Sequence, residues 1–117
     1  MKEQALDQLL AALSHTARRR ILDLVMEAPG ISVKALTTHF DVSRIQVLKH
    51  LDALETVDLI LSKKEGRTRH LFFNPIPIQQ LHDRWTTKYS AFWSERMVDI
   101  KSRVEGRIRE QEEKKSG

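Results

Sequence analysis

The feature that most constrains the fold is a long apolar stripe in the C-terminal third of this 117-residue chain. Its members recur mostly at steps of three or four residues, which is the period of one helix face: Ile78, Leu81, Trp85, Tyr89, Phe92, Trp93, Met97, Ile100, Val104 and Ile108. A helix of about 30 residues is roughly 45 Å long, whereas a domain of roughly 75 residues is only about 25 Å across. One protomer cannot cover such a stripe, so we expect a second chain to bury it.

A homodimer formed by the first and last helices is the resulting prediction. The first helix, residues 3–13, is amphipathic. The predicted interface residues are Leu6, Leu9, Leu13, Trp85, Tyr89, Phe92, Trp93, Met97 and Ile100. Four of the seven aromatic residues fall between Trp85 and Trp93, a pattern more typical of packing at a dimer seam than of a cofactor site. Solvent exposure of the far end, from about Val104, stays open as an alternative.

The segments before this stripe predict a helix-turn-helix followed by a β-hairpin. Ser14 is expected to cap a second helix, Ser32 a short third helix, and Ser43 a fourth helix through residue 57. Two short helices joined by a few residues are the signature of a helix-turn-helix. After the fourth helix, strand-like residues on either side of a turn at 65–67 predict a hairpin. Four cations lie near its tip: Lys63, Lys64, Arg67 and Arg69.

The predicted fold is therefore mainly α with a small β-hairpin: a winged helix-turn-helix with a long C-terminal dimerisation helix. We divide the chain into a winged helix-turn-helix domain at 1–76, a long helix at 77–110 and a charged tail at 111–117. The tail carries balanced charge and is expected to be disordered.

Charge and composition narrow the functional class. The net charge of +4 and the pI of about 9.6 suit an anionic partner. The absence of cysteine excludes disulfides, cysteine-ligated zinc and thiol catalysis within this chain. Glu3 and Asp7 stand where a signal peptide would need an apolar run, and no stretch approaches the ~20 apolar residues that span a bilayer. We expect a soluble cytoplasmic protein with no membrane partner.

Three segments, in this order and spacing, carry a family resemblance: LAALSHTARRRIL at 10–22, DVSRIQVLKHL at 41–51, and the stretch from LI at 59–60 through KKEGR at 63–67 to LFFNP at 71–75. Together they resemble the ArsR family of bacterial transcriptional repressors over about residues 5–76. The resemblance implies a repressor that excludes polymerase from an overlapping promoter. The C-terminal part looks like a subgroup of autorepressors that lack the family's metal sites.

The chain also departs from the family pattern. His15-Thr16 replaces the usual Asp-Pro, and Ile45-Gln46 and Leu48 replace the frequent Pro-Ala and Ser of the recognition helix, so the operator sequence does not carry over. The thiolate motif of the third helix is absent, and so are the Asp and His pairs of the last helix, where His82 and Asp83 are merely adjacent. We expect no metal site and no cofactor.

A helical wheel locates the surface that would read DNA. Val47, Leu51 and Leu54 define the buried side of the fourth helix, so the predicted DNA-binding residues of this helix are Ser43, Arg44, Ile45, Gln46, Leu48 and Lys49. Arg44 and Lys49 can reach guanine or phosphate, Gln46 suits adenine, and the two apolar residues suit thymine methyl groups. An alternative stays open for each of two residues. Ile45 could pack against the third helix instead of facing DNA, and Gln46 could be partly buried instead of contacting a base.

The wing cations Lys63, Lys64, Arg67 and Arg69 complete the predicted site, as contacts to phosphates or the minor groove. For the run Arg18 to Arg20 we expect one phosphate contact and ion pairs with acids such as Asp23 or Glu27. His50 is predicted to be a core residue rather than a base reader.

The predicted function is sequence-specific binding of double-stranded DNA by a dimeric transcriptional regulator. The alternative is a dimeric protein-interaction module on a winged-helix scaffold, suggested by Asp52, Glu55 and Asp58 late in the fourth helix. A continuous positive stripe from this helix to the wing would favour DNA. No nucleophile–base pair or glycine-rich phosphate motif suggests an enzyme, and the sequence names no small-molecule effector.

Overall fold

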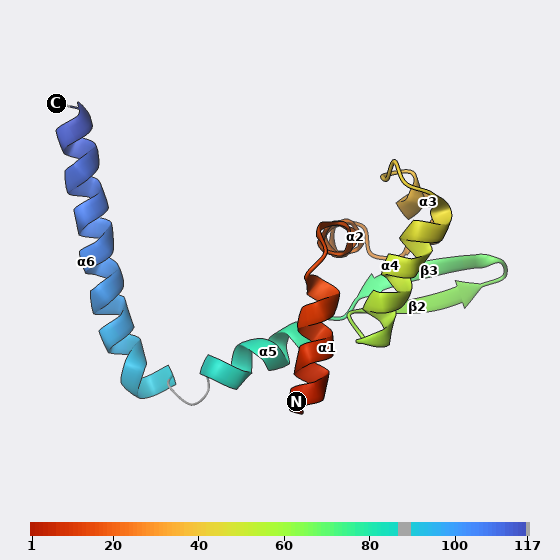
Figure 1. The fold of residues 1–117 in the computed structure, drawn as a ribbon, viewed down its shortest axis with the longest axis horizontal. Helices are drawn as coiled ribbons and strands as arrows, with labels where there is room; N and C mark the ends of the chain where they lie inside the picture. The colour runs from red at the N-terminus through yellow and green to blue at the C-terminus, as the bar shows by residue number, and fades with distance from the viewer. Residues whose placement is uncertain (87–89, 117) are drawn as a thin grey trace. The chain divides into compact units, whose positions relative to one another are not determined.

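The computed structural model (Figure 1) describes the backbone of residues 1–86 and 90–116 and the side chains of residues 1–86 and 96–114. The chain divides into two compact units, Met1–Leu81 and His82–Gly117. The first unit contains α1 (Glu3–Leu13), α2 (Thr16–Glu27), α3 (Val33–Thr37) and α4 (Arg44–Thr56). The order of helices, hairpin and C-terminal helix confirms the predicted fold class.

Serine side chains begin the two helices of the helix-turn-helix, as predicted. The Ser32 hydroxyl accepts a hydrogen bond from the Ala35 backbone N–H at 3.0 Å, and the Ser43 hydroxyl accepts one from that of Gln46 at 3.3 Å. Each bond satisfies a donor that the first turn of a helix would otherwise leave unpaired.

The expected cap at Ser14 is wrong. Ser14 lies at the C-terminal end of α1, where its hydroxyl donates to the Ala11 carbonyl oxygen at 2.6 Å. His15 is the residue that precedes α2. The link between the two helices is so short that Ser14 bonds back to the helix it ends rather than forward to the next one.

The sheet has three antiparallel strands in the order β1-β3-β2: β1 (Ile31–Ser32), β2 (Ile60–Glu65) and β3 (Thr68–Phe73). β2 and β3 form the predicted hairpin. Its two-residue loop places Gly66 first, at φ 61°, as tight hairpin turns with a leading glycine require. The pairing of β1 with β3 was not expected from the sequence.

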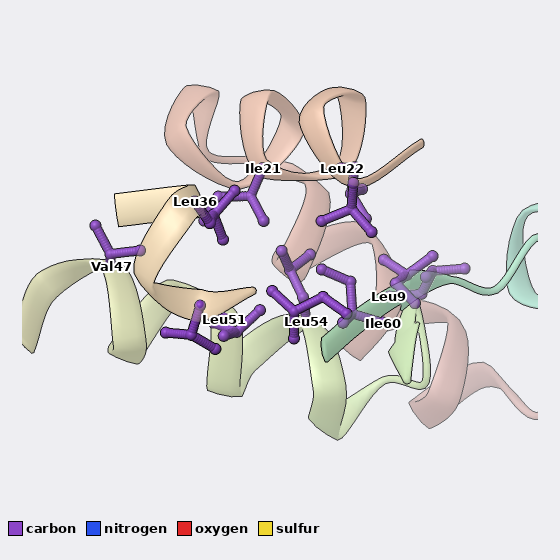
Figure 2. Close-up of a cluster of buried hydrophobic side chains, with 12 residues drawn as sticks. Leu9, Ile21, Leu22, Leu36, Val47, Leu51, Leu54 and Ile60 are labelled. Carbon is purple, nitrogen blue, oxygen red and sulfur yellow. The ribbon is translucent and has the colours of Figure 1, made fainter. Parts of the chain in front are cut away.

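The hydrophobic core lies between α1, α2, α3, α4 and the base of the sheet (Figure 2). It includes Leu9, Ile21, Leu22, Leu36, Leu51, Leu54, Ile60 and Leu71. Burial of side chains of this kind contributes roughly 1.5–3 kcal/mol each. The core fixes α4 against the sheet, and thereby positions the surface that the sequence predicted to read DNA.

Two of the residues predicted at the dimer interface belong instead to the interior of the chain. Leu6 is 5% exposed and Leu9 is 2% exposed, and Leu13 packs partly buried against the core. Leu6 and Leu9 cover their own domain and are not surface residues of the protomer, so their place in the predicted interface is wrong. The place of Leu13 there stays a prediction. Leu10, at 45% exposed, is the large apolar side chain that α1 leaves on the surface.

The C-terminal third contains α5 (Ile76–Thr86) and α6 (Ser90–Ser116). The tail was expected to be disordered beyond residue 110, but α6 continues to Ser116, since its Glu, Gln and Lys residues are good helix formers. Of the predicted interface residues, Trp85, Met97 and Ile100 are exposed. Tyr89 lies outside the described residues, and so do the side chains of Phe92 and Trp93.

Candidate nucleic-acid interface

The buried face of α4 is the one that the helical wheel predicted. Val47, Leu51 and Leu54 are at most 1% exposed. On the other side, Arg44, Gln46 and Lys49 are exposed, as the sequence pattern suggested. The first turn of α4 therefore presents polar and cationic side chains outward from a rigidly packed helix.

Ile45 shows how unusual this exposed face is. Its side chain is 67% exposed, so the alternative in which it packs against the third helix is wrong. Gln46 is also exposed, which removes partial burial as its explanation. Leu48, by contrast, is half-buried and packs partly against the core, so it offers a smaller apolar surface than Ile45. An isoleucine exposed at the start of a recognition helix suits contact with thymine methyl groups.

The turn after α4 positions the wing, residues 59–73. Asp58 adopts the left-handed conformation at φ 61°, and its carbonyl oxygen accepts a hydrogen bond of 2.9 Å from the Asn74 side chain. The Asn74 backbone N–H donates to the Leu59 carbonyl oxygen at 3.0 Å. The two ends of the wing are thereby tied together at its base, close to the end of α4.

The wing cations do not share one face. Lys64 and Arg69 are directly opposite each other in the hairpin register, on the side of Ile60 and Leu71, which are buried. Lys63 lies on the other side of the hairpin, where its ammonium is 3.6 Å from a Glu65 carboxylate oxygen. The structure therefore separates Lys63 from the other predicted phosphate contacts.

A concavity of about 530 Å³ lies between the start of α3, the first turns of α4 and the inner face of the wing. It brings together most of the cations predicted from the sequence. Its lining residues are Ser32, Val33, Lys34, Arg44, Leu48, Lys64, Arg67, Thr68 and Arg69. Five of these nine carry a positive charge and none carries a negative one, so the concavity is suited to an anion.

Lys34 is the lining residue that sequence reasoning missed. It is exposed in the first turn of α3. The signal that could have found it was its place two residues after the Ser32 cap. In a helix-turn-helix the first helix crosses the DNA backbone, so a lysine in its first turn comes close to phosphates.

The arginine run of α2 contacts groups other than the acids expected. Arg19 donates to the Leu13 carbonyl oxygen at 2.7 Å, and the Arg20 guanidinium lies 4.9 Å from the centre of the Phe40 ring. Arg18 donates through Nε to Nδ1 of His50 at 3.2 Å. These contacts tie α2 to the end of α1, to Phe40 in the loop after α3, and to α4. The expected pairing with Asp23 or Glu27 is therefore wrong for the described side chains.

His50 lies half-buried on α4 and is not among the core residues, so its interpretation as a core residue is wrong. Its ring centre is 5.8 Å from that of His15. Burial lowers the pKa of His50, and the Arg18 and His15 charges lower it further. The neutral ring, which can accept the Arg18 hydrogen bond, is therefore the favoured form.

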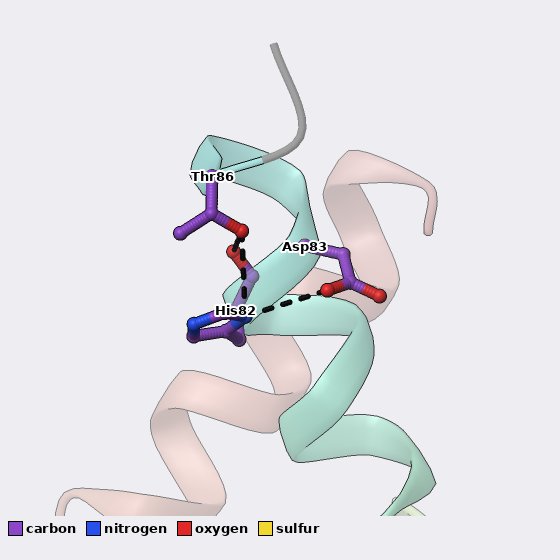
Figure 3. A network of polar contacts seen from close by, with 3 residues as sticks. All are labelled: His82, Asp83 and Thr86. Atoms are coloured by element: carbon purple, nitrogen blue, oxygen red, sulfur yellow. Dashed lines mark hydrogen bonds and ion pairs between the residues drawn. The ribbon is translucent and has the colours of Figure 1, made fainter. Parts of the chain in front are cut away.

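His82 on α5 has two polar side chains of the same helix beside it. Figure 3 shows its ring beside Asp83 and Thr86: Nδ1 is 3.4 Å from Asp83 Oδ1 and 3.3 Å from Thr86 Oγ1. All three side chains belong to one exposed helix segment. Across the residues described, no three His, Asp or Glu side chains gather as metal ligands.

Comparison with known proteins shows to which family the chain belongs. A helix-turn-helix domain family matches residues 13–62. The chain is 36% identical over 85 residues to the uncharacterized HTH-type transcriptional regulator YuzN of Bacillus subtilis (strain 168), a match that covers 68% of this chain and 92% of that protein. A solved ArsR-like transcriptional regulator from Rhodococcus sp. RHA1 is 31% identical, with a TM-score of 0.65, over 85% of this chain and 92% of that one.

The chain belongs to the ArsR family of winged helix-turn-helix regulators. It is accordingly a DNA-binding transcriptional regulator. The homodimeric winged helix-turn-helix domain of Mb0332 from Mycobacterium bovis has the same fold, with 22% identity and a TM-score of 0.59 over 67% of this chain and 71% of that one. In the part of this ArsR-family chain that the structure describes, no helix is long and apolar enough to cross a membrane.

Proposed function

We propose that this ArsR-family regulator is a cytoplasmic homodimeric repressor, without enzymatic activity, that binds two half-sites of a DNA operator. Each protomer inserts the first turns of α4 into the major groove and lays the inner face of its wing along the backbone. The observation that supports this most is the cation-lined concavity between α4 and the wing, because it joins the two predicted contact regions in one positively charged surface.

The roles of individual residues follow from their positions. Arg44, Gln46 and Lys49 project from the exposed side of α4 and are proposed to read base edges, with Ile45 against thymine methyl groups. Lys34, Lys64 and Arg67 line the concavity and are proposed to neutralise phosphates. Ser43 caps α4 and is proposed to sit close to the backbone at the groove edge.

The proposed dimer follows from the exposed apolar residues of α5 and α6. Trp85, Met97 and Ile100 are 56%, 58% and 51% exposed within the protomer, and Val104 and Ile108 continue the stripe on α6. A protein of the same fold, Mb0332, is described as homodimeric. Two winged helices bound to one face of B-DNA must be held about 34–36 Å apart, and paired C-terminal helices would set that spacing.

Binding to duplex DNA over a range of salt concentrations tests this proposal. If about eight phosphates are neutralised per dimer, the logarithm of the affinity should fall against the logarithm of salt with a slope near −7. Selection from a random duplex pool should yield a site with two related halves. A chain that binds no duplex, or binds with no dependence on salt, would contradict the proposal.

A further inference from the structure

One cation of the concavity differs from the others because it has an acidic partner. Nη2 of Arg69, on β3, forms an ion pair with Oε2 of Glu55, which lies in the last turn of α4. The Glu55 side chain is 21% exposed and that of Arg69 is 36% exposed. Within the described residues, no ion pair is formed by Lys34, Arg44, Lys64 or Arg67.

The pair joins two elements that must act together. Glu55 belongs to the helix proposed to enter the major groove, and Arg69 to the strand whose inner face carries Lys64. The other carboxylate oxygen, Glu55 Oε1, is buried and has no hydrogen-bond partner among the described residues. The Glu55 carboxylate thus depends on Arg69 for its one described polar contact. Arg69 lines the concavity, but this carboxylate offsets part of its positive charge.

We infer that Glu55 is a positioning residue for DNA binding. Its ion pair with Arg69 tethers the wing to α4. On this inference Arg69 fixes the angle at which the wing meets the backbone and does not itself neutralise a phosphate. This reverses the role predicted for Arg69 from the sequence, where it was grouped with the phosphate contacts. The inference rests on the proposed function for its effect on DNA, but the tether itself is a property of the free protein.

The test must remove the pair without leaving a lone charge, because one partner of a partly buried pair is costly to leave alone. The double variant Glu55→Gln/Arg69→Met does so, since the net charge is unchanged and Met keeps the length of the arginine stem. Arg67→Ala is the matched control, because Arg67 lines the same concavity and has no acidic partner among the described residues.

The first measurement is the affinity of the full chain for a random-sequence duplex of about 30 bp, long enough for two half-sites. Fluorescence anisotropy between about 50 and 200 mM salt gives the log–log slope. Arg67→Ala should flatten the slope by about 0.9 for each phosphate that is no longer neutralised, while the double variant should keep the wild-type slope. A double variant that flattens the slope as much as Arg67→Ala would show that Arg69 binds a phosphate, and would overturn the inference.

The second measurement is hydrogen exchange of the wing amides in the free protein. Loss of the tether should accelerate exchange in β2 and β3 relative to α2, whereas Arg67→Ala should leave those rates unchanged. Equal wing exchange in the double variant and the wild type would overturn the tether. If the wild-type chain bound no duplex at all, the proposed function would fail, and the exchange rates would still decide the role of Glu55.

Discussion

Arg18 and His50 form a contact that depends on the protonation state of one ring. The Arg18 guanidinium donates to Nδ1 of His50, which must carry a free lone pair to accept it. Protonation would remove that acceptor and place a positive charge beside Arg18 and His15. Because His50 is on α4 and Arg18 is on α2, the contact links the recognition helix to the helix beneath it.

Stability should therefore fall on mild acidification. The folded-state pKa of His50 is lowered from 6.5, mainly by burial, so the unfolded chain binds a proton more readily than the folded one. The contribution of His50 is complete above pH 6.5 and is lost as the pH falls from 6.5 through the folded-state pKa. Urea unfolding at several pH values should show this loss. His50→Gln should remove that part of the pH dependence, and an unaltered profile in this variant would contradict the assignment.

Lys49 and Lys64 should differ in the kind of DNA binding they support. Lys64→Ala should weaken binding to all sequences alike and flatten the salt slope, since it lines the concavity. Lys49→Ala should change the preference among operator variants by about 1–3 kcal/mol at one base position per half-site. Competition binding with single-base variants measures this preference. An unchanged preference would make Lys49 a phosphate contact.

The sequence predicted the exposed side of α4 well. Once Val47, Leu51 and Leu54 are known to be buried, the 3.6-residue period fixes the direction of the remaining side chains of the helix. It could not predict that Arg69 pairs with Glu55, since that contact joins residues 14 positions apart on different elements. The place of Lys34 two residues after the Ser32 cap is a local signal, but its position beside the wing residues of the concavity arises only after folding.

At the level of elements, the recognition helix depends on a single hydroxyl for its first turn. Ser43→Ala should reduce the free energy of unfolding by about 1 kcal/mol, because the Gln46 N–H loses its acceptor. Ser43→Asp should retain the cap and the stability. The same carboxylate would repel phosphates at the groove edge, so DNA affinity should fall in this variant. Equal stability of the wild type and Ser43→Ala in urea would contradict the role of the cap.

The helix-turn-helix and the hairpin were predictable because their signals are local: serine caps, a glycine turn and a change of hydrophobic period. β1 was not, because a two-residue strand has no period to detect and forms only when Ile31 and Ser32 pair with β3. The sequence also could not show which apolar residues of α1 lie in the core and which would lie at a dimer interface. Leu6 and Leu9 have the same pattern whether they face their own chain or another.

At the scale of the whole molecule, assembly should depend on the apolar stripe of α6. Met97→Glu/Ile100→Glu places charges on this exposed face and should convert the proposed dimer to a monomer without unfolding the first unit. Burial of each such side chain is worth roughly 1.5–3 kcal/mol before the cost of association. Ser102→Glu, about 140° from Met97 and about 160° from Ile100 around α6, is the control that should remain dimeric.

Sedimentation and operator binding should change together in these variants. The double variant should sediment as a monomer and bind its operator weakly, while Ser102→Glu should match the wild type in both measurements. A double variant that still sediments as a dimer would place the interface elsewhere, with the exposed Leu10 of α1 as the next surface to alter.

Side chains alternate between the two faces of the wing hairpin, and this limits how the wing can change in evolution. Lys64 and Arg69 share one face of the hairpin, and the exposed pair Leu61 and Phe72 shares the other. Inserting or deleting one residue in one strand would move the side chains of that strand beyond the change to the opposite face. In β2 this would exchange the faces of Leu61 and Lys64, and in β3 those of Phe72 and Arg69. Related proteins should therefore tolerate substitutions at exposed wing positions other than Lys64, Arg67 and Arg69, while the length of each strand changes only by even steps.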